Sequence, residues 1–158
     1  MNILVLCTGN SARSILLESI FNDAAPGRVT AWSAGSQPTG KVHPHSLRLL
    51  SRLGHDVTRA RSKSWDEFAG PDAPAMDIVI TVCGSAAGET CPVWPGAPVR
   101  AHWGVEDPAA AAEADWDAAF GEAYRILSPR AHALLAEPFE EMSPADLKTT
   151  LDRIGALA

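Results

Sequence analysis

The sequence predicts a single α/β domain in which a parallel, four-stranded sheet has helices on both faces. Short apolar runs, which are typical of buried parallel strands, alternate with segments of helical periodicity. The length of 158 residues suits one domain, and no internal repeat or low-complexity linker divides it. Ligands in this architecture bind beyond the carboxyl ends of the strands, so residues at those ends are the first candidates for function.

The strands are predicted from composition. Four segments are apolar enough to be buried strands, namely residues 3–6, 29–33, 77–82 and 99–103. The third is the clearest, because it is almost wholly apolar and rich in β-branched side chains.

The helices are predicted from periodicity, which covers residues 13–21, 44–53 and 112–136, with a short helical turn at 64–68. Pro129 is expected to kink or divide the longest of them. Ser143 and Pro144 are typical first residues of one more helix. We therefore expect a main domain of residues 1–137 and a helical extension, residues 138–158, that packs on the same domain.

Charge and composition exclude several classes of function. The formal net charge is −6, whereas proteins that bind nucleic acids or membrane surfaces need clustered positive charge. No apolar run reaches the ~18 residues of a membrane span, and no targeting segment is visible. We therefore expect a cytoplasmic protein without nucleic-acid or membrane partners. In a reducing cytoplasm, its three cysteines should not form structural disulfides.

The segment that follows the first strand has the pattern of an oxyanion-binding loop. Five residues separate Cys7 from Arg13, and the expected oxyanion ligands are the loop residues Thr8, Gly9, Asn10, Ser11, Ala12, Arg13 and Ser14. A tight loop that runs into a helix directs successive backbone N–H groups at an anion. Gly9 is expected to supply an unusual φ, and Arg13 a planar fork for two anion oxygens. The same positive field should lower the pKa of Cys7.

Other interpretations of this loop are weaker. A buried, inert cysteine at a strand end is the ordinary alternative for Cys7, but it does not explain the spacing to Arg13. A Walker phosphate loop would need a Gly-x4-Gly-Lys-Ser/Thr run, which is absent.

Two further cysteines lie on one Gly-rich segment. Cys83 follows the third predicted strand, and seven residues separate it from Cys91. A thiol set of this kind can pass an oxidation from sulfur to sulfur. Ordinary buried cysteines and metal ligands are the alternatives. Structural zinc is disfavoured because the sequence has neither a Cys-x2-Cys pair nor a His-x3-5-His pair, and we expect no metal.

The loop resembles the signature of the low-molecular-weight tyrosine phosphatases and of the arsenate reductases that share their fold. Residues 32–35 and 102–108 resemble further blocks of that superfamily. Together with Cys83 and Cys91, the resemblance covers most of residues 2–136 and favours the reductase branch. It implies a low-molecular-weight phosphatase-like fold, and it implies that Asp107, which precedes Pro108, protonates a leaving oxygen. A helix N-cap is the compatible alternative for Asp107.

The resemblance also implies a reaction. Arsenate would bind in the loop, Cys7 would attack arsenic, and a disulfide would then pass from Cys7 to Cys83 and on to Cys91. Phosphate would compete with arsenate, no cofactor would be needed, and thioredoxin or a glutaredoxin/small-thiol system would be the reductant. Ala12 stands where many relatives have another cysteine. Lys63 lies where some relatives hold a potassium ion and could take its place.

Two other functions stay open on the sequence. A tyrosine phosphatase would use Cys7, Arg13 and Asp107 in the same way. Against it, Ala109 follows Pro108 where the phosphatases have a tyrosine, and a phosphatase has no use for the later cysteines. A non-catalytic redox sensor would bind an anion and report oxidation through reversible disulfides, but it would need no general acid.

Overall fold

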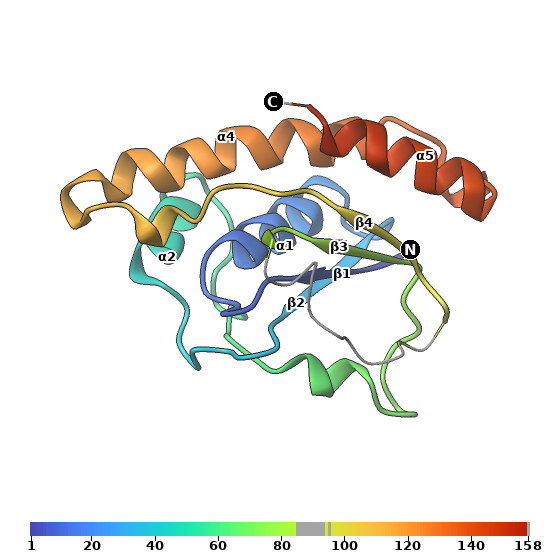
Figure 1. The fold of residues 1–158 in the computed structure, drawn as a ribbon, viewed down its shortest axis with the longest axis horizontal. Coiled ribbons are helices and arrows are strands. Elements are labelled where there is room, and N and C mark those ends of the chain that lie inside the picture. The colour runs from blue at the N-terminus through green and yellow to red at the C-terminus, as the bar shows by residue number, and fades with distance from the viewer. Residues whose placement is uncertain (85–93, 95, 158) are drawn as a thin grey trace.

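The computed structural model describes residues 1–84, 94 and 96–157, and it contains the predicted parallel sheet (Figure 1). Four parallel strands lie in the order β2-β1-β3-β4. Their bounds are Asn2–Leu6 for β1, Thr30–Ala34 for β2, Ile78–Thr81 for β3 and Val99–His102 for β4. The prediction of a single α/β domain is confirmed, and each predicted strand lies within two residues of the observed one.

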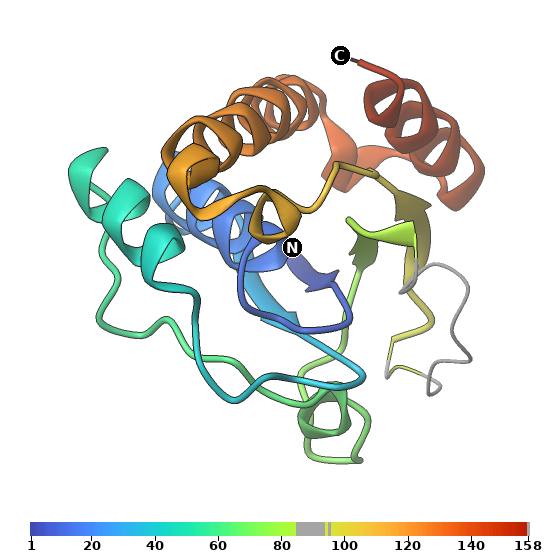
Figure 2. The same ribbon diagram turned by 60° about the vertical axis from the view of Figure 1, so that its left-hand side comes forward.

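The two faces of the sheet are covered unequally. Four α-helices pack into the core that contains Ile3 and Val5 of β1, namely α1 (Arg13–Ala24), α2 (Pro44–Arg52), α4 (Trp116–Leu135) and α5 (Pro144–Gly155). Leu4 and Leu6 point the other way, into a smaller cluster that includes Phe68 of the short 3-10 helix η1, Trp65–Phe68. Figures 1 and 2 both show η1 on the side of the strands opposite α4. No helix in the described ranges is long and apolar enough to span a membrane.

Side chains of α1 close the outer edge of β2. The amide of Asn22 donates to the carbonyl of Ala31 at 3.0 Å and accepts from its N–H at 2.8 Å. The carboxylate of Glu18 accepts a hydrogen bond from the hydroxyl of Ser33 at 2.7 Å, and another from the Ser33 N–H. These contacts satisfy backbone groups that an edge strand would otherwise expose for pairing with another chain.

Helix α4 differs from the prediction in two ways. It begins at Trp116, because residues 113–115 form a separate 3-10 turn, and it does not divide at Pro129. Pro129 removes the hydrogen bond to the carbonyl of Arg125, four residues earlier. Both residues are exposed, so water can satisfy that carbonyl and the helix can continue.

Helix α5 lies against β4 at the edge of the sheet. As predicted, the hydroxyl of Ser143 caps it by accepting from the N–H of Asp146 at 3.2 Å, and Pro144 begins it. Its buried face consists of Leu147, Leu151 and Ile154. The Trp103 indole N–H donates to the Leu151 carbonyl at 3.0 Å. Residue 137 as a domain boundary stays a prediction.

Gly155 is expected to set how closely α5 approaches β4. A Cβ at this position would lie 2.8 Å from Cδ1 of Trp103 and 2.9 Å from the carbonyl oxygen of His102. Gly155→Ala should therefore lower the free energy of unfolding by about 1–3 kcal/mol, the usual effect of overpacking. Gly121→Ala is the control, because it adds a methyl group in open space within α4 and should stabilise by roughly 0.5–1 kcal/mol. Urea unfolding of both variants measures the difference, and equal effects would contradict the packing argument.

Candidate active site

The sheet brings two cysteines together. Cys7 follows β1, Cys83 lies two residues after β3, and these strands are neighbours. Both thiols are buried and neither is in a disulfide. The backbone N–H of Thr8 donates to the sulfur of Cys83 at 3.3 Å, and the Thr8 hydroxyl lies 3.7 Å from the same sulfur. The side chains of Cys7 and Cys83 are themselves hydrogen-bonded, so the two sulfurs form a pair.

The prediction that the loop lowers the pKa of Cys7 is wrong for this arrangement. The hydrogen bond with Cys83 and burial raise the pKa of Cys7, and they outweigh Arg13 and the N–H of Gly9, which lower it. The physical reason is that two buried sulfurs in contact cannot both carry a negative charge without strong repulsion. We therefore expect at least one of the two sulfurs to stay protonated.

Asn10 determines the shape of the loop, and it adopts the unusual φ that the sequence suggested for Gly9. Its φ is 46°, in the left-handed region, whereas Gly9 has no positive φ. The Asn10 amide donates to the Ser14 hydroxyl at 2.9 Å and accepts from the N–H of Lys63 at 2.9 Å. Asn tolerates this backbone region better than most residues, and here two hydrogen bonds hold it.

Gly35 belongs to the block of residues 32–35, and no site role was predicted for it from the sequence. A Cβ at this position would lie 2.3 Å from the carbonyl oxygen of Thr8 and 2.6 Å from that of Cys7. The N–H of Cys7 donates to Ala34 at 3.2 Å, which brings the end of β2 against the start of the loop. Only a residue without a side chain permits this approach.

Arg13, the first residue of α1, lies at the mouth of the loop. One of its terminal nitrogens donates to the carbonyl of Val105 at 2.9 Å, and the other lies 3.7 Å from the carboxylate of Asp107. Its Nε is buried and has no hydrogen-bond partner among the described residues. A buried donor without a partner is unfavourable, so this N–H is available to an anion oxygen.

Asp107 has the N-cap role that the sequence left open, and its role as a general acid stays a prediction. Its Oδ1 accepts from the N–H of Ala109 at 3.0 Å and so caps a short 3-10 helix, Pro108–Ala110. Its Oδ2 is the atom nearest Arg13, and the side chain is 43% exposed. The cap fixes the carboxyl group while leaving one oxygen at the mouth of the site.

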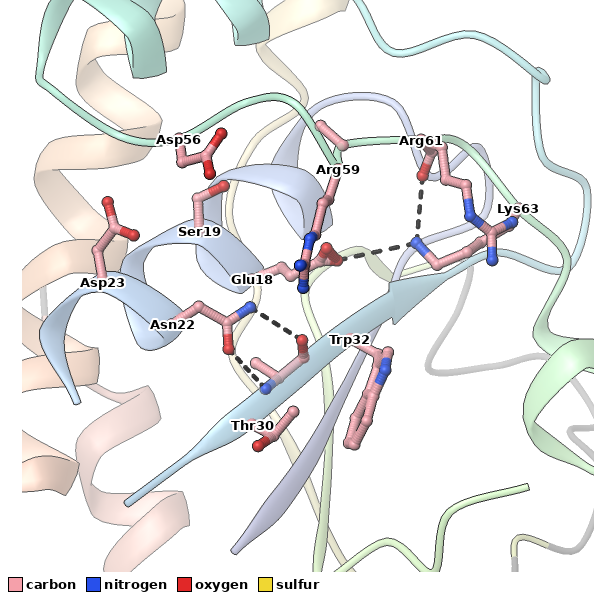
Figure 3. Close-up of a pocket in the computed structure, with 12 residues that line it drawn as sticks. Glu18, Ser19, Asn22, Asp23, Thr30, Trp32, Asp56, Arg59, Arg61 and Lys63 are labelled. Carbon is pink, nitrogen blue, oxygen red and sulfur yellow. Dashed lines mark hydrogen bonds and ion pairs between the residues drawn. The ribbon is translucent and has the colours of Figure 1, made fainter. Parts of the chain in front are cut away.

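A largely buried ion pair, which the sequence did not predict, lies behind the loop. The ammonium of Lys63 is 3.8 Å from Glu18 of α1, and Figure 3 shows both side chains beside β2. Burial is the main cause of a raised pKa for Glu18 and of a lowered pKa for Lys63. Since the backbone N–H of Lys63 also holds Asn10, this pair connects the loop to α1.

Cys91 and residues 102–108 also carry the sequence resemblance. Cys91 lies outside the residues that the structure describes, so its predicted role is not tested. Trp103, which lies in the block of residues 102–108, is buried in the core, with its ring centroid 6.1 Å from that of Phe21.

The fold and the site define a class of small α/β enzymes that act on a tetrahedral oxyanion with a cysteine. The sequence profile of the low molecular weight phosphotyrosine protein phosphatase family matches residues 2–153, and the chain belongs to that family. Arsenate reductase of Halalkalibacterium halodurans is 35% identical over 113 residues, which are 72% of this chain and 78% of that protein.

Solved structures agree with this assignment. Arsenate reductase from Archaeoglobus fulgidus is 27% identical with a TM-score of 0.61, and the match covers 82% of this chain and 98% of that one. A low molecular weight phosphotyrosine phosphatase from Vibrio cholerae has a TM-score of 0.70 at 19% identity, over 89% of this chain and 97% of that one. The fold alone therefore does not separate a reductase from a phosphatase.

Proposed function

We propose that this protein reduces arsenate to arsenite for arsenic detoxification. The observation that carries the proposal is the hydrogen-bonded pair of Cys7 and Cys83 at the end of the oxyanion loop. A phosphatase needs one nucleophilic thiol, whereas reduction needs a second sulfur that can displace the first from arsenic. The named activity of the curated relatives, which are arsenate reductases, supports the same function.

In the proposed first step, arsenate enters the loop and accepts hydrogen bonds from its backbone N–H groups and from Nε of Arg13. Cys7 gives its proton to the arsenate dianion and its thiolate attacks arsenic, so that a sulfur–arsenic bond forms and a hydroxyl group leaves as water after Asp107 protonates it. Arg13 acts twice, because it binds the anion and also lies near the carboxyl group that delivers the proton.

In the second step, Cys83 attacks the sulfur of Cys7. The electron pair of the sulfur–arsenic bond passes to arsenic, which becomes arsenite, and the two sulfurs become a disulfide. Once Cys7 is bonded to arsenic, its negative charge no longer opposes the ionisation of Cys83. The two donor groups of Thr8 then stabilise the Cys83 thiolate.

The remaining steps concern Cys91 and the reductant. Cys91 attacks Cys83 and releases Cys7, and the Cys83–Cys91 disulfide is reduced by thioredoxin or by a glutaredoxin/small-thiol system. Phosphate competes for the loop because it is also a tetrahedral anion. The reaction requires no metal or organic cofactor, and its place would be the cytoplasm.

The competing function is tested by comparing two substrates. Pre-reduced protein with a thiol reductant is assayed for arsenite formation from arsenate, and separately for hydrolysis of p-nitrophenyl phosphate. We expect arsenite formation to require both Cys7 and Cys83, with slow hydrolysis that requires Cys7 alone. Rapid hydrolysis without arsenite would show a phosphatase and would overturn the proposal.

Asp107→Asn separates the general acid from the helix cap. An asparagine oxygen can still accept from the N–H of Ala109, so the thermal midpoint should hardly change. It cannot deliver a proton, so the rate of arsenite formation should fall roughly hundredfold or more. If the rate stays at the wild-type level, Asp107 serves as a cap only.

A further inference from the structure

A second cavity lies at the outer edge of β2, away from the cysteine pair. Its volume is about 400 Å³, within the usual range for small-molecule sites. It is enclosed by α1, by β2 and by residues 56–63 (Figure 3). The oxyanion loop and the proposed reaction do not use this cavity.

The charges that line the cavity form an acidic pole and a basic pole, and Glu18, which lies at the basic pole, is paired with Lys63. Asp23 and Asp56 lie at one side, with the hydroxyl of Ser19 between them (Figure 3). Arg59 extends into the cavity from the other side, and Arg61 and Lys63 follow it along the chain.

Some polar atoms of the charged groups that face the cavity have no hydrogen-bond or ion-pair partner within the described part of the chain. Arg61 is paired with Glu67, at 2.6 Å, but the Arg59 guanidinium has no hydrogen bond or ion pair within the described part of the chain. Asp56 uses Oδ1 for Thr58, and Asp23 uses Oδ2 for His55. One oxygen of each carboxylate therefore stays available to a ligand.

From this arrangement we infer that the cavity binds a small zwitterion of the amino-acid or short-peptide class. The ammonium group of such a ligand would lie against Asp23 and Asp56, and its carboxylate would pair with the Arg59 fork. The opposite charges lie on opposite sides of the cavity and do not touch each other. They therefore match a ligand whose positive end faces the carboxylates and whose negative end faces Arg59. An anion or a cation alone would satisfy only one pole.

The ligand is also expected to act on the oxyanion loop. The Ser62 hydroxyl donates to the carbonyl of Gly9 at 3.1 Å, and the N–H of Lys63 donates to the Asn10 side chain at 2.9 Å. A ligand held by Arg59 would restrain this segment and so restrain the loop. Binding at the cavity should then raise the affinity of the loop for its anion, and the anion should raise the affinity of the cavity equally.

Isothermal titration of the reduced, full-length protein tests the inference with glycylglycine as the zwitterionic probe. N-acetylglycylglycine lacks the positive charge and glycylglycinamide lacks the negative one, so both are matched controls. We expect each control to bind about tenfold more weakly or worse. Arg59→Gln and Asp56→Asn should weaken glycylglycine similarly, whereas Arg52→Gln, outside the cavity, should leave it unchanged.

A second titration measures inorganic phosphate with and without saturating glycylglycine. We expect phosphate to bind about fivefold tighter or more when the probe is present. Unchanged phosphate affinity would overturn the effector role. Glycylglycine binding that is no tighter than that of either control, or that survives both cavity variants, would overturn the site itself. Neither titration depends on whether the protein reduces arsenate.

Discussion

Gly35→Ala is expected to abolish most arsenite formation while leaving much of the fold intact. The new methyl group would lie 2.3 Å from the carbonyl oxygen of Thr8 and 2.6 Å from that of Cys7. Both contacts are to backbone atoms, so the loop itself must move. Displacements of about 1 Å at a catalytic group can lower a rate roughly hundredfold, and we expect at least this loss.

The matched control is Gly70→Ala. A methyl group at residue 70 meets nothing within 4 Å, so the rate and the thermal midpoint should stay close to those of the wild type. Arsenite formation and phosphate affinity should fall together in Gly35→Ala, because both depend on the loop. A wild-type rate of arsenite formation in Gly35→Ala would show that the close approach of β2 does not determine the geometry of the loop.

Lys63→Ala is expected to destabilise the protein by about 3–5 kcal/mol. It removes the ammonium partner of Glu18, whose largely buried carboxylate is 3.8 Å away. An uncompensated buried charge is strongly unfavourable, whereas a pair replaced by neutral side chains of similar size often is not. The double variant Lys63→Met with Glu18→Gln should therefore recover most of the loss, and urea unfolding measures both.

The surface provides the comparison for this prediction. Lys148 and Asp152 form an ion pair at 2.9 Å in which both side chains are about half exposed. Lys148→Ala should change the free energy of unfolding by no more than about 1 kcal/mol, because water screens exposed pairs. If Lys63→Ala is as mild as Lys148→Ala, the Glu18 charge is already satisfied by Ser33 and the pair contributes little.

The fold could be predicted from the sequence because its main signals are local. Apolar runs identify β1 and β3, and parallel strands place their carboxyl ends on one edge of the sheet. Cys7 and Cys83 each follow one of these strands, so a shared position for them could be predicted too. The Ser143 cap of α5 is equally local and was found.

Features that depend on contacts between distant segments could not be predicted in this way. The role of Gly35 arises where the end of β2 meets the loop after β1, and no periodicity signals that contact. The left-handed residue is Asn10 because Ser14 and Lys63 hold its side chain. The shifted pKa of Cys7 follows from its hydrogen bond with Cys83, which a sequence pattern does not contain.

Single-turnover arsenite formation tests the central claim, transfer of oxidation from Cys7 to Cys83, most directly. Pre-reduced protein receives arsenate without added reductant, and disulfides are then mapped by mass spectrometry. We predict about one arsenite per chain for the wild type, because two thiols release two electrons when they form one disulfide. Cys91→Ser should accumulate a Cys7–Cys83 disulfide, and Cys83→Ser should release no arsenite. A wild-type yield of arsenite from Cys83→Ser would contradict the account.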